Sequence, residues 1–182
     1  MEVDFKMFNL IDVNLESKMD KVLHYVAKSL SQTGHNSKPV LLHSFKVAMT
    51  LYEFNYSEEI VISGALHDLI EDTDVCYEDI CNIYGEKIAK IIDAVSFNPK
   101  IKDKLVQAKT MYERCRENGY EALIVKCADL LDNINFVNLV ENCTIREQLF
   151  KKYELFLNIS KSVIGQEKIY HMLKERLNDV RH

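Results

Sequence analysis

The sequence predicts an all-α protein, folded as a single compact bundle of about seven to nine helices. Three observations predict this class. Apolar residues recur every three or four positions along most of the chain, which is the period of an amphipathic helix. Alternating β-branched runs, which would indicate strands, are nearly absent. Only five glycines and two prolines occur in 182 residues, and several of them lie where a periodic stretch ends.

The helices expected in the first part of the chain each have a boundary signal. Ser17 and Asp20 have the spacing of a capping box, and Gly34 ends the stretch that follows them. Pro39 suits the first turn of a second helix. Ser57 is a candidate N-cap for the third, because two glutamates follow it at the positive end of the helix. These signals predict helices over residues 17–34, 39–54 and 58–72.

The remaining helices are bounded in the same way. Gly85 and Pro99 end two successive periodic stretches, and Gly119 is placed as a C-terminal cap. Thr144 and Glu147 have capping-box spacing before the next stretch. The helices predicted here cover residues 77–84, 86–97, 103–118, 120–140, 146–164 and 166–180.

Length and composition are those of a soluble globular protein. Apolar residues make up 47% of the chain and charged residues 28%. The length fits one domain over residues 1–182, with a motif-bearing core at about 20–140 and C-terminal helices at 144–180. No apolar run approaches the roughly 18 to 20 residues that a membrane span requires, so we expect no membrane partner.

The cellular compartment is predicted from the N-terminus and the cysteines. The first residues lack a basic region followed by an apolar stretch, so no signal peptide is expected. The five cysteines are odd in number and form no CxxC pair, which favours reduced thiols in a cytoplasm. The formal charge of −5 argues against nucleic acid as a partner, since that needs a broad basic surface.

Carboxylates gather beside a histidine in the stretch GALHDLIEDTDV, residues 64–75. Asp68 and Asp72 are four positions apart, as are His67 and Glu71, so each pair shares one helical turn. Like charges at this spacing repel by a few tenths of a kcal/mol. A solvated acidic face is one interpretation. A bound cation is the other, because it would remove the repulsion.

Two further residues favour the cation. His43 lies in the apolar stretch VLLHSF, and Asp129 lies in EALIVKCADLL, where a charged carboxylate is costly to bury unless it is paired. Taken singly, each has an ordinary structural explanation. Together with His67 and Asp68 they form a mixed nitrogen and oxygen set suited to Mn²⁺, Fe²⁺ or Zn²⁺. Glu71 and Asp72, one turn further on, would orient or deprotonate a metal-bound water.

The order of these residues resembles the HD superfamily of metal-dependent phosphohydrolases, and within it the hydrolase domain of the RelA/SpoT family and the small alarmone hydrolases. The resemblance is carried by KPVLLHSFKVAMTL, by ISGALHDLIEDTDVCYEDICNIYGEKIAKIIDAVS and by ALIVKCADLLDNI, which cover roughly residues 38–136. It implies an HD-domain helical fold. It also implies a manganese-dependent enzyme that removes the 3′-pyrophosphate from the nucleotide ppGpp or pppGpp.

The resemblance also assigns roles to single residues. It implies His43, His67, Asp68 and Asp129 as metal ligands, and Glu71 and Asp72 as the pair that activates water. Asn133 would hydrogen-bond the ribose or a phosphate, and the substrate phosphates would be bound by Lys100, Arg114 and Lys126.

The sequence departs from that family before His43. Relatives carry an Arg-Lys pair there that flanks the nucleobase, and here the stretch SQTGHNSKPVLLHS contains no arginine, so His35 and Lys38 are the candidates to replace the pair. The synthetase half of the bifunctional enzymes has no counterpart, so we expect hydrolysis and no synthesis. Two alternatives remain: an HD phosphohydrolase acting on another nucleotide or phosphorylated dinucleotide, and a regulator that binds metal and nucleotide without cleavage.

Overall fold

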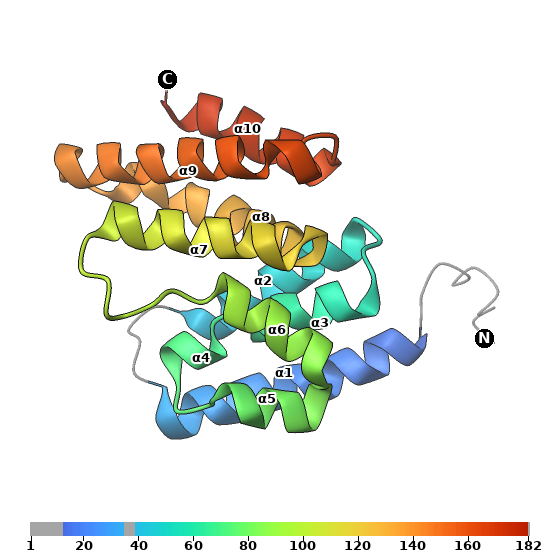
Figure 1. The fold of residues 1–182 in the computed structure, drawn as a ribbon. Coiled ribbons are helices and arrows are strands. Elements are labelled where there is room, and N and C mark those ends of the chain that lie inside the picture. The colour runs from blue at the N-terminus through green and yellow to red at the C-terminus, as the bar shows by residue number, and fades with distance from the viewer. Residues whose placement is uncertain (1–12, 35–38, 182) are drawn as a thin grey trace, which may run out of the picture.

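The computed structural model describes residues 13–34 and 39–181, and within these ranges it contains helices and no strand (Figure 1). His35 and Lys38, and the N-terminal residues used to judge a signal peptide, lie outside the described residues. The helices are α1 (Val13–Thr33), α2 (Val40–Glu53), α3 (Glu58–Leu66), α4 (Leu69–Asp72), α5 (Tyr77–Tyr84), α6 (Glu86–Val95), α7 (Lys104–Asn118), α8 (Tyr120–Asn133), the 3-10 helix η2 (Ile134–Leu139), α9 (Cys143–Ile164) and α10 (Lys168–Arg181). The predicted all-α class is therefore confirmed.

Several predicted boundaries are confirmed and have a clear cause. Gly85 and Gly119 adopt φ angles of 91° and 119°, which glycine reaches without strain, and each separates two helices at a sharp turn. Ser57 occupies the N-cap position of α3, and Asp103 caps α7 by accepting hydrogen bonds from the backbone N–H groups of Leu105 and Val106.

Other boundaries differ from the prediction. Ser17 and Asp20 lie inside α1, which already includes Val13, so they form no capping box at its start. The start of α9 is capped by Asn142, whose side chain accepts from the Ile145 N–H, and this places Thr144 within the helix. The stretch predicted as one helix over 120–140 tightens into the 3-10 turn η2 after Asn133.

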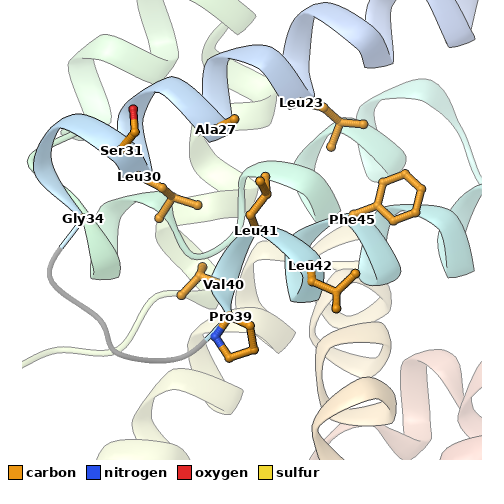
Figure 2. Close-up of a pocket in the computed structure, with 10 residues that line it drawn as sticks. All are labelled: Leu23, Ala27, Leu30, Ser31, Gly34, Pro39, Val40, Leu41, Leu42 and Phe45. Carbon is orange, nitrogen blue, oxygen red and sulfur yellow. The ribbon is translucent and has the colours of Figure 1, made fainter.

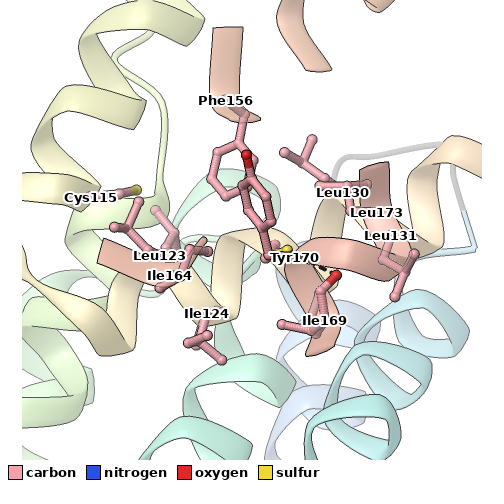
Figure 3. Packing of buried hydrophobic residues seen from close by; sticks show 14 of the residues in the cluster. Cys115, Leu123, Ile124, Leu130, Leu131, Phe156, Ile164, Ile169, Tyr170 and Leu173 are labelled. Atoms are coloured by element: carbon pink, nitrogen blue, oxygen red, sulfur yellow. Dashed lines mark hydrogen bonds between the residues drawn. The ribbon is translucent and has the colours of Figure 1, made fainter. Parts of the chain in front are cut away.

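The helices are arranged in layers. In Figure 1, α9 and α10 lie at one end, α1 and α5 lie at the other, and α2, α3 and α6 lie between them. Two apolar clusters fill the space between the layers. One gathers around α8 and the helices that face it, α9 and α10, where Phe156 and Ile164 pack near Leu123 and Ile124 (Figure 3). The other joins α1 and α5 to α6.

The middle layer contributes to both clusters. Leu51 of α2, Val61 of α3 and Ile91 of α6 belong to the first cluster, whereas their neighbours Ala48, Ile62 and Ile92 belong to the second. Every residue of α3 from Ile60 to Leu66 is buried as a result. This double burial holds α2 and α3 in fixed positions; His43 lies on α2, and His67 directly follows α3. Within the described ranges, no helix is both long and apolar enough to cross a membrane.

Candidate metal centre and active site

His67 and Asp68 lie where the predicted helix 58–72 is interrupted between α3 and α4. The His67 Nδ1–H donates to the Gly64 carbonyl oxygen, 2.8 Å away, which lies one turn back in the chain. A new turn begins at Asp68, whose carbonyl oxygen accepts from the Asp72 N–H at 2.9 Å. With Nδ1 occupied, the Nε2 of a neutral His67 carries a free lone pair, and it lies 3.1 Å from Asp68 Oδ1.

His43 reaches the same point from α2. Its Nε2 is 3.2 Å from the His67 Nε2 and 3.1 Å from Asp129 Oδ1 on α8. Asp68 Oδ2 lies 3.6 Å from the same nitrogen. The other ring nitrogen, Nδ1, donates to Asp132 Oδ2 at 2.8 Å, because a carboxylate oxygen only accepts. Ligand atoms of His43, His67 and Asp129 therefore all lie within 4.8 Å of one another, and the fourth predicted ligand, Asp68, lies beside both histidines.

The chemistry of this donor set fits a divalent cation. Both Nδ1 atoms are used as donors, so two Nε2 lone pairs and two carboxylates face one another over 3.1 to 3.7 Å. Such atoms repel unless a positive charge lies among them. Although burial of His67 opposes protonation, Asp68 and Asp129 raise the pKa of its imidazole well above the usual range, so a proton and a metal ion would compete for the same position.

Asp129 is held in its charged form by its surroundings. It is 4% exposed, and burial alone would favour the neutral acid. The Lys126 ammonium lies 2.8 Å from Asp129 Oδ2, and together with the two imidazoles it keeps the pKa of Asp129 well below its usual range. Asn133, one turn further along α8, donates its side-chain N–H to Asp129 Oδ1. Lys126 also donates to the Val95 carbonyl oxygen at 3.3 Å, which ties α8 to the end of α6.

Glu71 and Asp72 lie on α4, directly after the proposed ligands. The Glu71 Oε1 atom accepts from the Phe97 backbone N–H at 2.7 Å, which fixes the carboxyl group beside the site. Burial raises the pKa of Glu71 to about 7, Lys126 opposes this shift and Asp68 adds to it. A carboxylate with this pKa can take a proton from water near neutral pH. Asp72 is buried next to it, at 8% exposed.

Two of the predicted phosphate-binding residues lie elsewhere. The Arg114 guanidinium donates to the backbone carbonyls of Ala94 and Ser96 at the end of α6, so it holds α7 against α6. Lys100 is exposed on the loop between α6 and α7, and its backbone N–H donates to the Asn98 side chain at 3.0 Å. Its side chain lines neither the cavity beside His43 nor the cavity beside Asp129. Lys126 lines one of these cavities, but its ammonium is already paired with Asp129.

Two cavities flank the convergence point and share Asn133 and Phe136. One, of about 280 Å³, is lined by the charged or polar residues His43, Lys46, Asp68, Asp132 and Asn133 and by the apolar residues Pro39, Val40, Leu42 and Phe136. The other, of about 320 Å³, lies between α7, α8 and α9 and includes Asp129. A third and wider cavity of about 780 Å³ lies between α1 and α2 (Figure 2). Its described lining residues are apolar apart from Ser31 and include no ionisable group.

Three residues at the site were not singled out from the sequence: Asp132, Lys104 and Lys152. Asp132 is three positions after Asp129 on α8, so the two carboxylates share one face of the helix. That spacing could have identified Asp132 once Asp129 was chosen. Lys104 and Lys152 come from α7 and α9, and no spacing in the sequence indicates that they meet.

A family model described as "HD domain" matches residues 22–155 of the chain. Among named proteins, the chain is similar to a guanosine-3′,5′-bis(diphosphate) 3′-pyrophosphohydrolase of Aquifex aeolicus, with 31% identity over 70% of this chain and 21% of that protein. It is also similar to the bifunctional (p)ppGpp synthase/hydrolase SpoT of Escherichia coli K12, with 29% identity over 57% of this chain and 15% of that protein. The chain therefore spans about a fifth or less of the length of these curated relatives.

A solved structure of a metazoan ortholog of SpoT, described as hydrolysing ppGpp, has a similar fold. The TM-score is 0.71 with 20% sequence identity, over 90% of this chain and 93% of the other. At that identity the match concerns the fold alone. Because the two structures match along nearly the whole of both chains, the helices of this protein have the arrangement of a fold that is already known.

Proposed function

Since this chain belongs to the HD domain family, we propose that it is a metal-dependent hydrolase that removes the 3′-pyrophosphate from (p)ppGpp, with Mn²⁺ as its metal. The observation that carries the proposal is the convergence of His43, His67, Asp68 and Asp129, with the second nitrogen of each histidine held by a hydrogen bond. The names of the relatives support the substrate. We take residues 1–182 as one HD domain and expect it to act in the cytoplasm.

The proposed reaction is hydrolysis of a phosphoester bond: ppGpp and water give GDP and pyrophosphate. A divalent metal bound by the four ligands would acidify a water and polarise a phosphoryl oxygen. Glu71, and Asp72 beside it, would accept the proton that this water loses. Lys126 keeps Asp129 ionised and therefore able to act as a ligand. Asn133 lines both flanking cavities, so its side chain would lie against a substrate that enters either of them.

A second candidate is an HD phosphohydrolase acting on a different nucleotide. The observation that favours it is the cavity beside His43, where the family's Arg-Lys pair is missing and the described walls include Pro39, Val40, Leu42 and Phe136. These four side chains can pack against the face of any base, and the polar groups in the same cavity, those of Lys46, Asp132 and Asn133, can hydrogen-bond the edge of more than one base. Base selectivity is therefore the part of the proposal that the experiment has to decide.

The test is a product assay with purified protein and Mn²⁺, offering ppGpp beside GTP, ATP and NADPH. We expect pyrophosphate and GDP from ppGpp alone. Asp68→Ala should lose both bound metal and activity, because it removes a ligand. Glu71→Gln should keep the metal and lose about 10²-fold or more in kcat, because it removes the proton acceptor.

Other results of this assay would each change a different part of the proposal. Phosphate released from a different substrate would support the assigned site residues and show that ppGpp is not the substrate. Metal bound without any product would favour the regulator that binds and does not cleave. Stoichiometric metal retained in Asp68→Ala would refute the ligand assignment.

A further inference from the structure

The C-terminal end of α6 is bound by cationic side chains of two other helices. The last carbonyl groups of an α-helix have no partner within the helix itself. Here the Ala94 carbonyl oxygen accepts from Arg114 Nε on α7 at 3.3 Å, and the Val95 carbonyl oxygen accepts from Lys126 Nζ on α8, also at 3.3 Å. A positive charge is favourable at this end of a helix, because the carbonyl ends of the peptide dipoles face it. The backbone at the end of α6 is therefore fixed from both α7 and α8.

Arg114 also binds the peptide group that leads away from the helix. Its Nη2 atom donates to the Ser96 carbonyl oxygen. The Phe97 N–H belongs to the same peptide group, and it donates to Glu71 Oε1 at 2.7 Å. Because a peptide group is planar, its C=O and N–H have a fixed orientation relative to each other. The guanidinium that holds the carbonyl oxygen of this peptide therefore also sets the direction of the N–H that binds Glu71.

The hydrogen bond from Phe97 controls the position of the Glu71 carboxylate. Among the described residues, the Phe97 N–H is the one hydrogen-bond donor found for the Glu71 side chain. A cation that donates to the carbonyl oxygen polarises the peptide, which strengthens donation from its N–H to the carboxylate. Arg114 itself lines neither of the two cavities beside the site. Its connection to Glu71 therefore runs through the backbone.

We propose that Arg114 is a positioning residue for the water-activating carboxylate, and that it orients Glu71 through the peptide group between Ser96 and Phe97. The role assigned to Arg114 rests on the proposed function, in which Glu71 accepts the proton of the attacking water. A contact that only joined α7 to α6 would affect stability, whereas a contact that orients Glu71 affects the rate of the chemical step.

The first test is kinetic and uses Arg114→Gln, which removes the charge and the forked donor. With ppGpp and Mn²⁺, we expect kcat to fall about tenfold while KM stays within about twofold, because the hydrogen bond that orients Glu71 is weakened and no substrate contact is removed. Arg114→Lys keeps the charge and one donor, so it should recover part of the lost kcat. It also gives the same readouts if Arg114→Gln does not fold.

Two control variants separate this role from packing of α7. Arg116→Gln makes the same chemical change at an exposed arginine two positions further along α7. Asn118→Ala removes another bond between α7 and α6, from Asn118 Nδ2 to the Lys90 carbonyl oxygen at 3.4 Å, and leaves the peptide after Ser96 untouched. Both controls should keep the wild-type kcat.

A double variant shows whether Arg114 acts through Glu71. If it does, adding Arg114→Gln to Glu71→Gln should cause little further loss of kcat, because the carboxylate to be oriented is already gone. A full additional tenfold loss in the Glu71→Gln background, or a change confined to KM, would overturn the positioning role.

An NMR measurement is independent of turnover. In ¹⁵N-labelled protein loaded with Zn²⁺, a diamagnetic ion, the Phe97 amide proton should move upfield in Arg114→Gln and in Glu71→Gln, because its hydrogen bond weakens in both. It should keep its position in Arg116→Gln. If ppGpp is not hydrolysed but the resonance moves as expected, the positioning of Glu71 by Arg114 stands and the proposed reaction fails. A Phe97 resonance that is the same in Arg114→Gln and wild type would overturn the positioning role, whatever the activity.

Discussion

At the scale of single residues, the site depends on which nitrogen of each histidine is free. The His67 Nδ1 is held by a backbone carbonyl, whereas the His43 Nδ1 is held by the Asp132 carboxylate. A carboxylate behind a ligating imidazole fixes its tautomer and makes it a more basic ligand. Asp132 also lies 3.7 Å from the Lys46 ammonium, which helps to keep the carboxylate in place.

Asp132→Asn tests this positioning role. The change keeps the size of the side chain and removes its charge, so the imidazole of His43 becomes a weaker ligand. We expect the Kd for Mn²⁺ to rise by about 10- to 100-fold. Calorimetric titration of the metal-free protein with Mn²⁺ measures this.

Asp179→Asn, on the exposed surface of α10, makes the same chemical change away from the site and should leave the Kd unaltered. Equal affinities in Asp132→Asn and wild type would show that Asp132 does not position His43.

Much of the candidate metal centre could be predicted from the sequence, because a His-Asp pair and further carboxylates in apolar stretches are costly without a cation. Asp132 was missed because an aspartate near a helix end is common. The phosphate role of Arg114 came from the family resemblance, and in the structure its guanidinium donates to carbonyls at the end of α6. Backbone partners of this kind leave no pattern in the sequence.

At the scale of helices, the contact between α2 and α3 sets the distance between the two histidines. A Cβ atom added to Gly64 would lie 2.4 Å from Leu51 Cδ1, a contact too short to exist, and 3.6 Å from Ala48 Cα. Glycine at this position therefore leaves room for the buried Leu51 side chain between the two helices. The predicted helix 58–72 was expected to be continuous. Its interruption at His67 follows a side-chain bond to the carbonyl of this same glycine.

Gly64→Ala should destabilise the protein, although alanine is the better helix former. The added methyl group overpacks the contact with Leu51, and we expect the free energy of unfolding to fall by about 1–3 kcal/mol. Urea denaturation followed by circular dichroism measures the change.

The neighbouring Ser63→Ala is the control for that helix. The Ser63 Oγ atom is buried and has no hydrogen-bond partner among the described residues, so its removal should leave the stability unchanged or raise it by up to about 1 kcal/mol. A Gly64→Ala variant as stable as wild type would show that the helices can separate without cost.

At the scale of the whole molecule, the candidate ligands link parts of the chain that are far apart in sequence. His43 and Asp129 are separated by 86 positions, and the α3–α4 junction supplies the other two ligands. The all-α class followed from helical periodicity, since that signal is local. The cavity that contains Lys104, Lys126 and Lys152 could not be predicted from periodicity, because it depends on how α7, α8 and α9 pack against one another.

Removal of the metal should therefore lower the thermal stability of the whole protein. A ligand that binds only the folded state at a hundred times its Kd adds about 2.7 kcal/mol. We expect Tm to fall by several degrees after treatment with EDTA and to recover when Mn²⁺ is added. Differential scanning calorimetry measures both steps. Asp68→Ala should show no response to Mn²⁺, and a response as large as that of wild type would place the ion elsewhere.

The middle layer of α2, α3 and α6 has a consequence for local opening. Because α2, α3 and α6 contribute side chains to both apolar clusters, these helices are covered on two sides, and the loss of one cluster leaves them packed against the other. Backbone amides in the buried part of α3 can then exchange their hydrogen with solvent only when the entire fold opens. The outer helices can fray while α2 and α3 stay packed, so we expect the two candidate histidines to lie in or beside the slowest-exchanging part of the protein.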